Sequence, residues 1–170
     1  MRSLWILILG GLVLSPVAQA AETITVEMRL INVQGLGPSV GSITATDSPQ
    51  GVVFSPALKN LPPGLHGFHL HDNPACEPGE QDGKMAAGIA AGHHYDPART
   101  GKHLGPAGAG HLGDLPQLEV APDQTVSKPV TASRLKLAEL KGRALIIHAG
   151  PDNFSDKPGG DRIACGVIGS

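Results

Sequence analysis

The chain has 170 residues, which suits one domain with one core, and no internal repeat suggests a second unit. Aromatic residues make up only 3% of the chain, whereas 23 glycines and 15 prolines are many for this length, a composition that favours short strands and turns over a helical bundle. The formal net charge of −2 gives no basis for nucleic acid or an anionic membrane as a general partner.

The N-terminal residues 1–20 are predicted to be a signal peptide, with 21–170 as the mature domain. Arg2 supplies a positive charge, an apolar run follows over 4–14, and Ala18-Gln19-Ala20 has the small residues that signal peptidase recognises. The run is short for a bilayer span, although an uncleaved membrane anchor is the alternative. Cleavage leaves 12 of the 13 basic residues against 15 acidic ones, a net charge of −3. We therefore expect an exported protein with no membrane association after cleavage.

Short strands with turns between them dominate the mature chain. The first is typical: Ile24, Val26, Met28 and Leu30 alternate with polar residues, which is the period of a half-buried strand. The predicted strands in chain order are 23–31, 43–46, 52–54, 67–71, 118–120, 130–131, 144–148 and 163–168, and one or two helical turns are predicted over 134–141. Strands of this length and spacing predict an antiparallel sandwich or barrel.

Strand patterns are missing from 72–116, and a loop of that length needs something else to order it. The segment holds Cys76 and four of the eight histidines. Cys76 and Cys165 are the only cysteines, so one disulfide is expected in an exported protein, with two buried thiols as the alternative. Closing a loop of 89 residues would stabilise the fold by about 4–5 kcal/mol at most.

Several histidines have the spacing of metal ligands. His69 and His71 are two apart on an extended segment, so both side chains lie on one face and can reach one ion. His111 precedes Asp114 by three residues, and His148 ends an apolar strand. All-nitrogen sites suit copper, whereas nitrogen sites with one carboxylate suit tetrahedral zinc. A histidine can equally be a buried, hydrogen-bonded residue, and we expect that of His66, which should bind nothing.

Taken together, these segments resemble the copper/zinc superoxide dismutase family, in its exported bacterial branch. The matching motifs are Gly-Phe-His-Leu-His at 67–71, His-Tyr-Asp-Pro at 94–97, Gly-Lys-His at 101–103, Gly-His-Leu-Gly-Asp-Leu at 110–115, Ile-His at 147–148 and Arg-Ile-Ala-Cys-Gly-Val-Ile-Gly at 162–169. They occur in family order from about residue 24 to residue 169. The resemblance implies an all-β fold, an eight-stranded Greek-key β-barrel with long metal-binding and electrostatic loops.

The resemblance also implies a site with one copper and one zinc per chain. The implied copper ligands are His69, His71, His94 and His148. The implied zinc ligands are His94, His103, His111 and Asp114, with His94 bridging the metals as an imidazolate. Asp152 matches a carboxylate that links a copper histidine to a zinc histidine, Arg162 matches the arginine that guides superoxide, and Cys76 and Cys165 match the family disulfide. The implied activity is dismutation of superoxide to oxygen and hydrogen peroxide, as antioxidant defence in the periplasm.

Two positions depart from the family pattern. His93 stands where the family has a small residue, and Tyr95-Asp96-Pro97 favours His94 over His93 as the bridging ligand. The loop before Arg162 is shorter than in bacterial relatives, and it places Asp161 beside that arginine. Lys84 and Lys157 are candidates for steering the anionic substrate, with simple solvation as the alternative. The branch includes both monomers and homodimers, and the sequence leaves that choice open.

Two other functions compete with the enzyme. One is a periplasmic binding protein that stores or delivers copper on the same barrel, and the other is a sandwich with a purely structural role. Copper-carrying relatives usually lose zinc ligands or the arginine, and here all of those positions are filled. A structural sandwich has no use for six histidines and an aspartate in family register. The sequence therefore favours the enzyme.

Overall fold

The computed structural model describes residues 22–155 and 159–169, so the predicted signal peptide and Lys157 lie outside the described residues. The strands are β1 (Thr23–Asn32), β2 (Gly35–Ser48), β3 (Gly51–Leu58), β4 (Gly64–His66), β5 (Phe68–His71), β6 (Gly79–Gln81), β7 (Lys84–Ala86), β8 (Leu118–Val120), β9 (Val130–Ala132), β10 (Arg143–His148) and β11 (Arg162–Ile168). Two short 3₁₀ helices are η1 (Ile89–Ala91) and η2 (Leu137–Leu140). The second lies inside the predicted helical segment. Neither of these helical turns is a candidate for crossing a bilayer.

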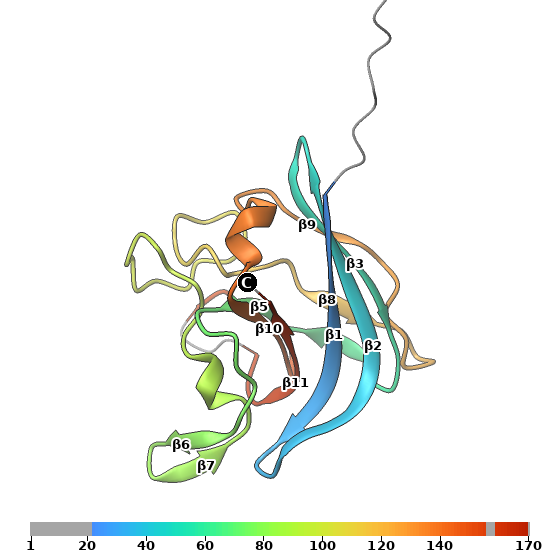
Figure 1. Cartoon of the computed structure of the whole chain (residues 1–170), viewed down its shortest axis with the longest axis vertical. Coiled ribbons are helices and arrows are strands. Elements are labelled where there is room, and N and C mark those ends of the chain that lie inside the picture. The colour runs from blue at the N-terminus through green and yellow to red at the C-terminus, as the bar shows by residue number, and fades with distance from the viewer. Residues whose placement is uncertain (1–21, 156–158, 170) are drawn as a thin grey trace, which may run out of the picture.

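One antiparallel sheet carries most of the fold, in the order β5-β10-β11-β1-β2-β3-β9. It curls around its inner face, and its blue and cyan strands β1 to β3 form one wall (Figure 1). β4 pairs with β8 and is separated from β5 only by Gly67. Counting β4 and β5 as one interrupted strand, and leaving aside the separate pair β6–β7, the described residues form eight strands. The predicted all-β barrel class is confirmed.

The core fills the inside of the curled sheet. Val26 and Met28 of β1 point inward and are buried, while Glu27 between them is exposed, as the alternating pattern predicts. The rings of Phe54 and Phe68 meet edge to face with centroids 5.4 Å apart, which is a favoured aromatic geometry. Val52 and Phe54 are fully buried, so these side chains belong to the core and not to a surface.

The segment 72–116 is less irregular than predicted. β6 and β7 form a hairpin within it, and η1 follows. Asp82 and Gly83 make the turn with φ of +52° and +75°. An Asp-Gly pair is a strong hairpin signal because its residues tolerate positive φ, so the sequence did contain the evidence for this element. The expectation of no strands in this segment was wrong.

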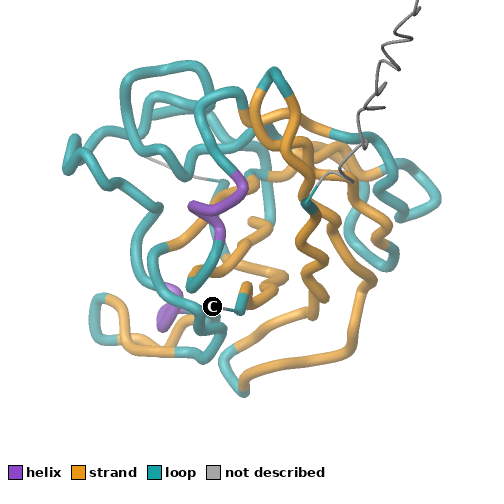
Figure 2. Tube along the Cα trace, turned by 45° about the horizontal axis from the view of Figure 1, so that its top comes forward, coloured by secondary structure: helices purple, strands orange, loops and turns teal. Residues whose placement is uncertain are grey.

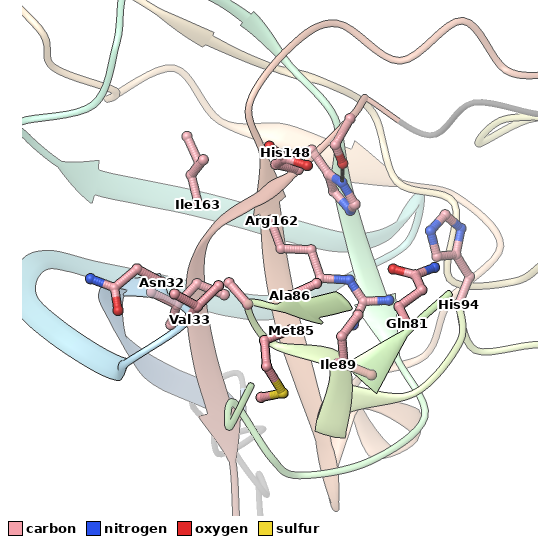
Figure 3. Close-up of a pocket in the computed structure, with 14 residues that line it drawn as sticks. Asn32, Val33, Gln81, Met85, Ala86, Ile89, His94, His148, Arg162 and Ile163 are labelled. Atoms are coloured by element: carbon pink, nitrogen blue, oxygen red, sulfur yellow. Dashed lines mark hydrogen bonds between the residues drawn. The ribbon is translucent and has the colours of Figure 1, made fainter. Parts of the chain in front are cut away.

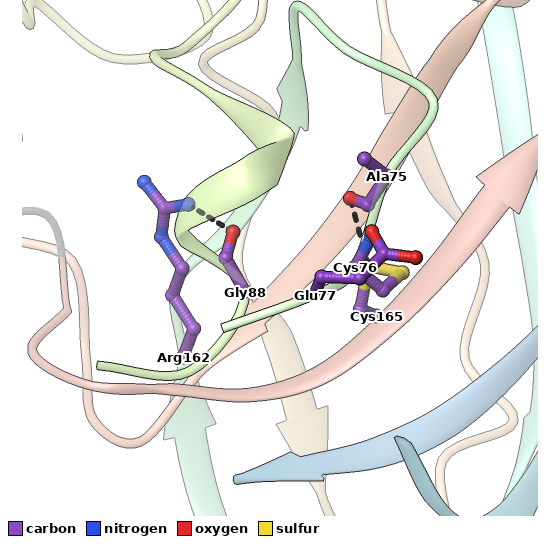
Figure 4. The surroundings of a disulfide bond; sticks show 6 residues. All are labelled: Ala75, Cys76, Glu77, Gly88, Arg162 and Cys165. Atoms are coloured by element: carbon purple, nitrogen blue, oxygen red, sulfur yellow. Dashed lines mark hydrogen bonds between the residues drawn. A yellow bond between two sulfur atoms is a disulfide. The ribbon is translucent and has the colours of Figure 1, made fainter. Parts of the chain in front are cut away.

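The predicted Cys76–Cys165 disulfide is confirmed, with the Cα atoms 5.9 Å apart (Figure 4). It joins the start of the long loop to β11 across 89 residues. Both cysteines belong to a small apolar cluster whose other buried members are Ile31, Ala91, Ala144 and Ile146. The long loops lie together on one side of the strands (Figure 2). The disulfide therefore ties the loop side of the molecule to the sheet.

Candidate metal centre

Four buried histidines converge where β5 and β10 lie side by side. β5 places His69 and His71 on one face, and His148 ends β10, the strand paired with β5. An isolated bridge joins His71 to His94. One nitrogen from each of these four rings lies within 4.8 Å of the others, which is a spacing that one ion can span.

A second group shares His94 with the first and adds His103, His111 and Asp114. Asp114 is the centre of this group. Its Oδ1 accepts a hydrogen bond from His94 Nδ1 at 2.9 Å, and it lies 2.8 Å from His103 Nδ1 and 3.4 Å from His111 Nδ1. The group has three histidine nitrogens and one carboxylate, which is the ligand chemistry of tetrahedral zinc, and it is called the zinc group below.

The first group (His69, His71, His94 and His148) is called the copper group below. In three of its histidines, an acceptor holds the ring nitrogen that points outward. His71 Nδ1 donates to Gly92 O at 3.0 Å, and His148 Nδ1 donates to Gly160 O at 2.8 Å. His69 Nε2 donates to Asp152 Oδ2 at 2.6 Å. A carbonyl can only accept, so these nitrogens carry the ring proton and the opposite nitrogens of neutral rings carry lone pairs.

Five ring nitrogens of the two groups, the three opposite nitrogens included, are buried and have no hydrogen-bond partner among the described residues. They are His69 Nδ1, His71 Nε2, His103 Nδ1, His111 Nδ1 and His148 Nε2. His103 Nδ1 is close to Asp114, but the contact lacks hydrogen-bond geometry. A buried polar atom without a partner is costly and uncommon. Five in one place fit a site built to bind metal ions.

Asp152 connects the two groups through the ring nitrogens that point away from the metal sites. Its Oδ2 faces His69 and its Oδ1 accepts from His103 Nε2 at 2.7 Å. The same three side chains could be read as a third metal group, but their facing atoms are already hydrogen-bonded to one another. Asp152 is itself fixed, because its backbone N–H donates to Gln117 Oε1 at 2.8 Å. This arrangement sets the orientation of both rings.

Burial and the two carboxylates shift the histidines in opposite directions. Burial lowers the pKa of His94 to about 4 and that of His148 to about 3. Burial opposes protonation of His103 too, but the adjacent carboxylates of Asp114 and Asp152 raise its pKa to about 9. Burial also opposes ionisation of these two carboxyls, yet their close contacts with His103 hold their pKa values below the usual range. The zinc group therefore attracts positive charge.

Arg162 starts β11 and reaches toward the histidines. Its Nη1 donates to Gly88 O at 2.6 Å (Figure 4), and its Nη2 donates to Gly92 O at 2.9 Å. Burial lowers the pKa of Arg162, but a guanidinium stays protonated near neutral pH. A cavity of about 710 Å³ is lined by Arg162, His94, His148 and Asp161 (Figure 3). A small anion entering this cavity meets a fixed cation beside two histidines of the copper group.

The remaining candidates belong to neither ligand group. His93 is exposed and lines a second cavity of about 680 Å³, on the side of His103 and His111. Lys84 is exposed on β7. His66 is buried, and its nitrogens lie 2.6 Å from His148 O and 2.8 Å from Pro62 O. The expectation that His66 is a buried, hydrogen-bonded residue is confirmed.

Some supporting residues were missed from the sequence. Gln117 fixes Asp152, and the carbonyls of Gly88, Gly92 and Gly160 hold Arg162, His71 and His148. Every residue except proline offers the same donor and acceptor in its backbone, so no residue type marks a carbonyl anchor in advance. Gln81 lines both cavities, and only the fold of the β6–β7 hairpin brings it there.

Comparison with known proteins agrees with this geometry. Residues 39–168 match the family model for copper/zinc superoxide dismutase. The chain is 53% identical over 164 residues to the Cu-Zn superoxide dismutase of Escherichia coli strain K12, covering 93% of this chain and 94% of that protein. It is 48% identical over 174 residues to the Brucella abortus enzyme, covering 99% of each.

Solved structures give the same result. The Cu/Zn superoxide dismutase from Brucella abortus superposes with a TM-score of 0.84 at 50% identity, covering 86% of this chain and 99% of that chain. The solution structure of the monomeric copper, zinc superoxide dismutase from Salmonella enterica gives a TM-score of 0.78 at 52% identity, with the same coverage. The chain therefore belongs to the copper/zinc superoxide dismutase family.

Proposed function

We propose that this chain dismutes superoxide in the periplasm with a copper and a zinc ion that share one histidine. The proposed copper ligands are His69, His71, His94 and His148, and the proposed zinc ligands are His94, His103, His111 and Asp114. The observation that carries the proposal is the pair of overlapping donor groups, in which five buried ring nitrogens have no hydrogen-bond partner among the described residues. Four of those five rings are held by a hydrogen bond at the other nitrogen: His69, His71, His103 and His148.

His94 is the residue placed to hold and move a proton. Its Nδ1 is fixed on Asp114, and its ring lines the cavity that Arg162 also lines. Copper, when bound, would supply the one-electron chemistry that turns one superoxide into oxygen and a second, with two protons, into hydrogen peroxide. Sharing His94 between two metals needs both of its nitrogens deprotonated, as an imidazolate. A proton returning to the nitrogen on the copper side would be in position for the peroxide product.

Arg162 is proposed to bind and orient superoxide. Its guanidinium is held by two carbonyls, so the cationic group is in place before the anion arrives. The planar fork keeps other N–H donors that those two bonds do not use. We expect Arg162→Ser to lower the rate of superoxide decay while leaving the metal content unchanged.

Export is supported by the signal-peptide pattern and by the disulfide. A disulfide that joins the active-site loop to β11 persists in an oxidising compartment and is uncommon in the cytosol. N-terminal sequencing of the protein from a periplasmic fraction should give Ala21 as the first residue. An N-terminus at Met1 would support the uncleaved anchor instead.

Elemental analysis combined with a superoxide-decay assay tests the whole proposal. We expect about one copper and one zinc per chain, and decay that disappears when copper is removed. Copper binding without superoxide decay would identify a copper carrier, and no stoichiometric metal would leave a structural sandwich. Sedimentation of the same sample decides between a monomer and the homodimer that the sequence left open.

A further inference from the structure

Arg134 reaches from the barrel to the loop that carries the zinc-group histidines. It follows β9 and is half-buried. Its Nη2 donates to Gly110 O at 2.9 Å, and its Nη1 donates to His111 O at 3.2 Å. One guanidinium therefore binds the carbonyl of a zinc-group histidine and the carbonyl just before it, 23 and 24 residues away along the chain.

The opposite side of residues 110–111 contacts Lys102, which precedes the zinc-group histidine His103. His111 N donates to Lys102 O at 2.8 Å. Gly110 packs so closely on Lys102 O that a Cβ atom there would collide with it. Residues 110–111 thus lie between Lys102 and Arg134. The Lys102 contact sets the spacing of His103 and His111, and Arg134 holds the pair against the barrel.

Backbone-to-backbone hydrogen bonds are few in this part of the chain, although Gly101 N donates to Asp96 Oδ2, His103 Nε2 to Asp152 Oδ1 and Asp114 N to His111 O at 3.5 Å. Residues 101–111 contain no helix or strand, and the backbone bonds inside this segment are Gly108 N to Gly105 O and His111 N to Lys102 O. Leu104 N and Gly105 N both donate to Asp114 Oδ2 at 3.2 Å, which uses a zinc-group side chain. Fixing irregular backbone costs conformational entropy, so two hydrogen bonds from a charged donor matter more here than in a sheet.

We propose that Arg134 is a positioning residue for zinc: it holds His111 in register with His103 and Asp114 and so slows the loss of the ion. The inference rests on the zinc ligands proposed above. Arg134 touches none of the ligand atoms, and it acts through the backbone carbonyls of Gly110 and His111. Residues that orient metal ligands from outside typically change metal affinity about 10–100-fold when they are replaced.

The test measures zinc release from the fully metallated protein into excess chromophoric chelator. Arg134→Met keeps the aliphatic stem and removes both donors, and we expect zinc to leave about 10–100-fold faster than from the wild type. Arg134→Lys can serve one carbonyl and should fall between the two. Copper release should change little. Cobalt(II) bound in place of zinc should show shifted visible bands in Arg134→Met, because its coordination geometry changes.

Arg29→Met is the matched control. Arg29 also donates to a backbone carbonyl, Gly37 O at 2.9 Å, but it lies on β1 in the barrel wall. Its replacement should leave the zinc release rate and the cobalt spectrum unchanged. Equal acceleration in Arg29→Met and Arg134→Met, or a wild-type rate in Arg134→Met, would overturn the inference alone. A wild-type protein that takes up no zinc would overturn the proposed ligand set together with this inference.

Discussion

Four histidines of the metal centre each have one nitrogen occupied by the protein and one left free. His69 and His103 are held by Asp152, His71 by Gly92 O and His148 by Gly160 O. The occupied nitrogen fixes the ring angle and, in a neutral ring, the position of the proton. The free nitrogen is then aimed at its metal group before any ion binds, which reduces the cost of assembling the site.

His94 and His93 give a direct test of the shared ligand. His94→Ala should reduce both copper and zinc content and lower the superoxide-decay rate by about tenfold or more, because its side chain belongs to both groups. His93→Ala is the control, since His93 is exposed and belongs to neither group. Elemental analysis and the copper spin-resonance spectrum measure the outcome. Loss of copper–zinc coupling in the His93 variant would show that the bridging ligand is off by one residue.

The raised pKa of His103 predicts a pH dependence for zinc binding. Below a pKa of about 9 the protonated ring competes with zinc, so zinc binding must displace that proton. We expect the apparent zinc affinity to fall about tenfold for each unit that the pH drops from 9 to 7, and to level off above 9. Competition with a chelator of known affinity across this range measures it. A flat profile between pH 7 and 9 would mean that His103 is already neutral there.

At the scale of elements, local patterns located strands but not their partners. Alternation located β1, and an apolar run located β10, because side-chain burial repeats along a strand. β2 extends over 14 residues, beyond its predicted four, because β1 pairs with it from Gly35 to Thr46 and β3 pairs with it from Gly41 to Ser48. Family motifs could indicate the ligand histidines. Gln117 and Arg134 act through contacts between distant segments, which no local pattern contains.

Removing the disulfide should loosen the β6–β7 hairpin and η1. Arg162, which is bound by the residues that flank η1, should become less well fixed as a result. A Cys76→Ala/Cys165→Ala variant should lose up to about 4–5 kcal/mol of unfolding free energy, since 89 residues are no longer closed. Gly88 and Gly92, which bind Arg162, flank η1, so the superoxide-decay rate should fall as well. Urea unfolding with both metals bound measures the first effect. An unchanged midpoint would show that the apolar packing around the cysteines holds the loop without the bond.

The charge of the whole molecule opposes its substrate. The predicted mature chain carries a net charge of −3, and superoxide is an anion. Exposed charges farther than about 8–10 Å from the cavity are largely screened at physiological salt. Attraction must therefore come from groups at the cavity itself, chiefly Arg162 and the bound metals. Lys84 lies on the exposed hairpin strand β7, and Lys157 lies outside the described residues.

Asp161, in the loop before Arg162, is an acidic residue at this cavity. It lines the same cavity as Arg162, yet among the described residues the guanidinium binds carbonyls and makes no ion pair with Asp161. The carboxylate is thus free to repel the substrate. Removing one unit charge within about a Debye length should raise the rate roughly twofold at low salt, and less as salt increases.

We therefore expect Asp161→Asn to speed superoxide decay at low ionic strength, measured by stopped flow across a salt series. Glu119→Gln is the matched control, because it removes the same charge from the exposed face of β8 and lines neither cavity. Salt should slow the wild type more than Arg162→Ser, which has lost the main attractive group. If Asp161→Asn and Glu119→Gln have the same low-salt rate, net charge alone sets the encounter. If neither differs from the wild type, the short loop does not weaken the substrate field.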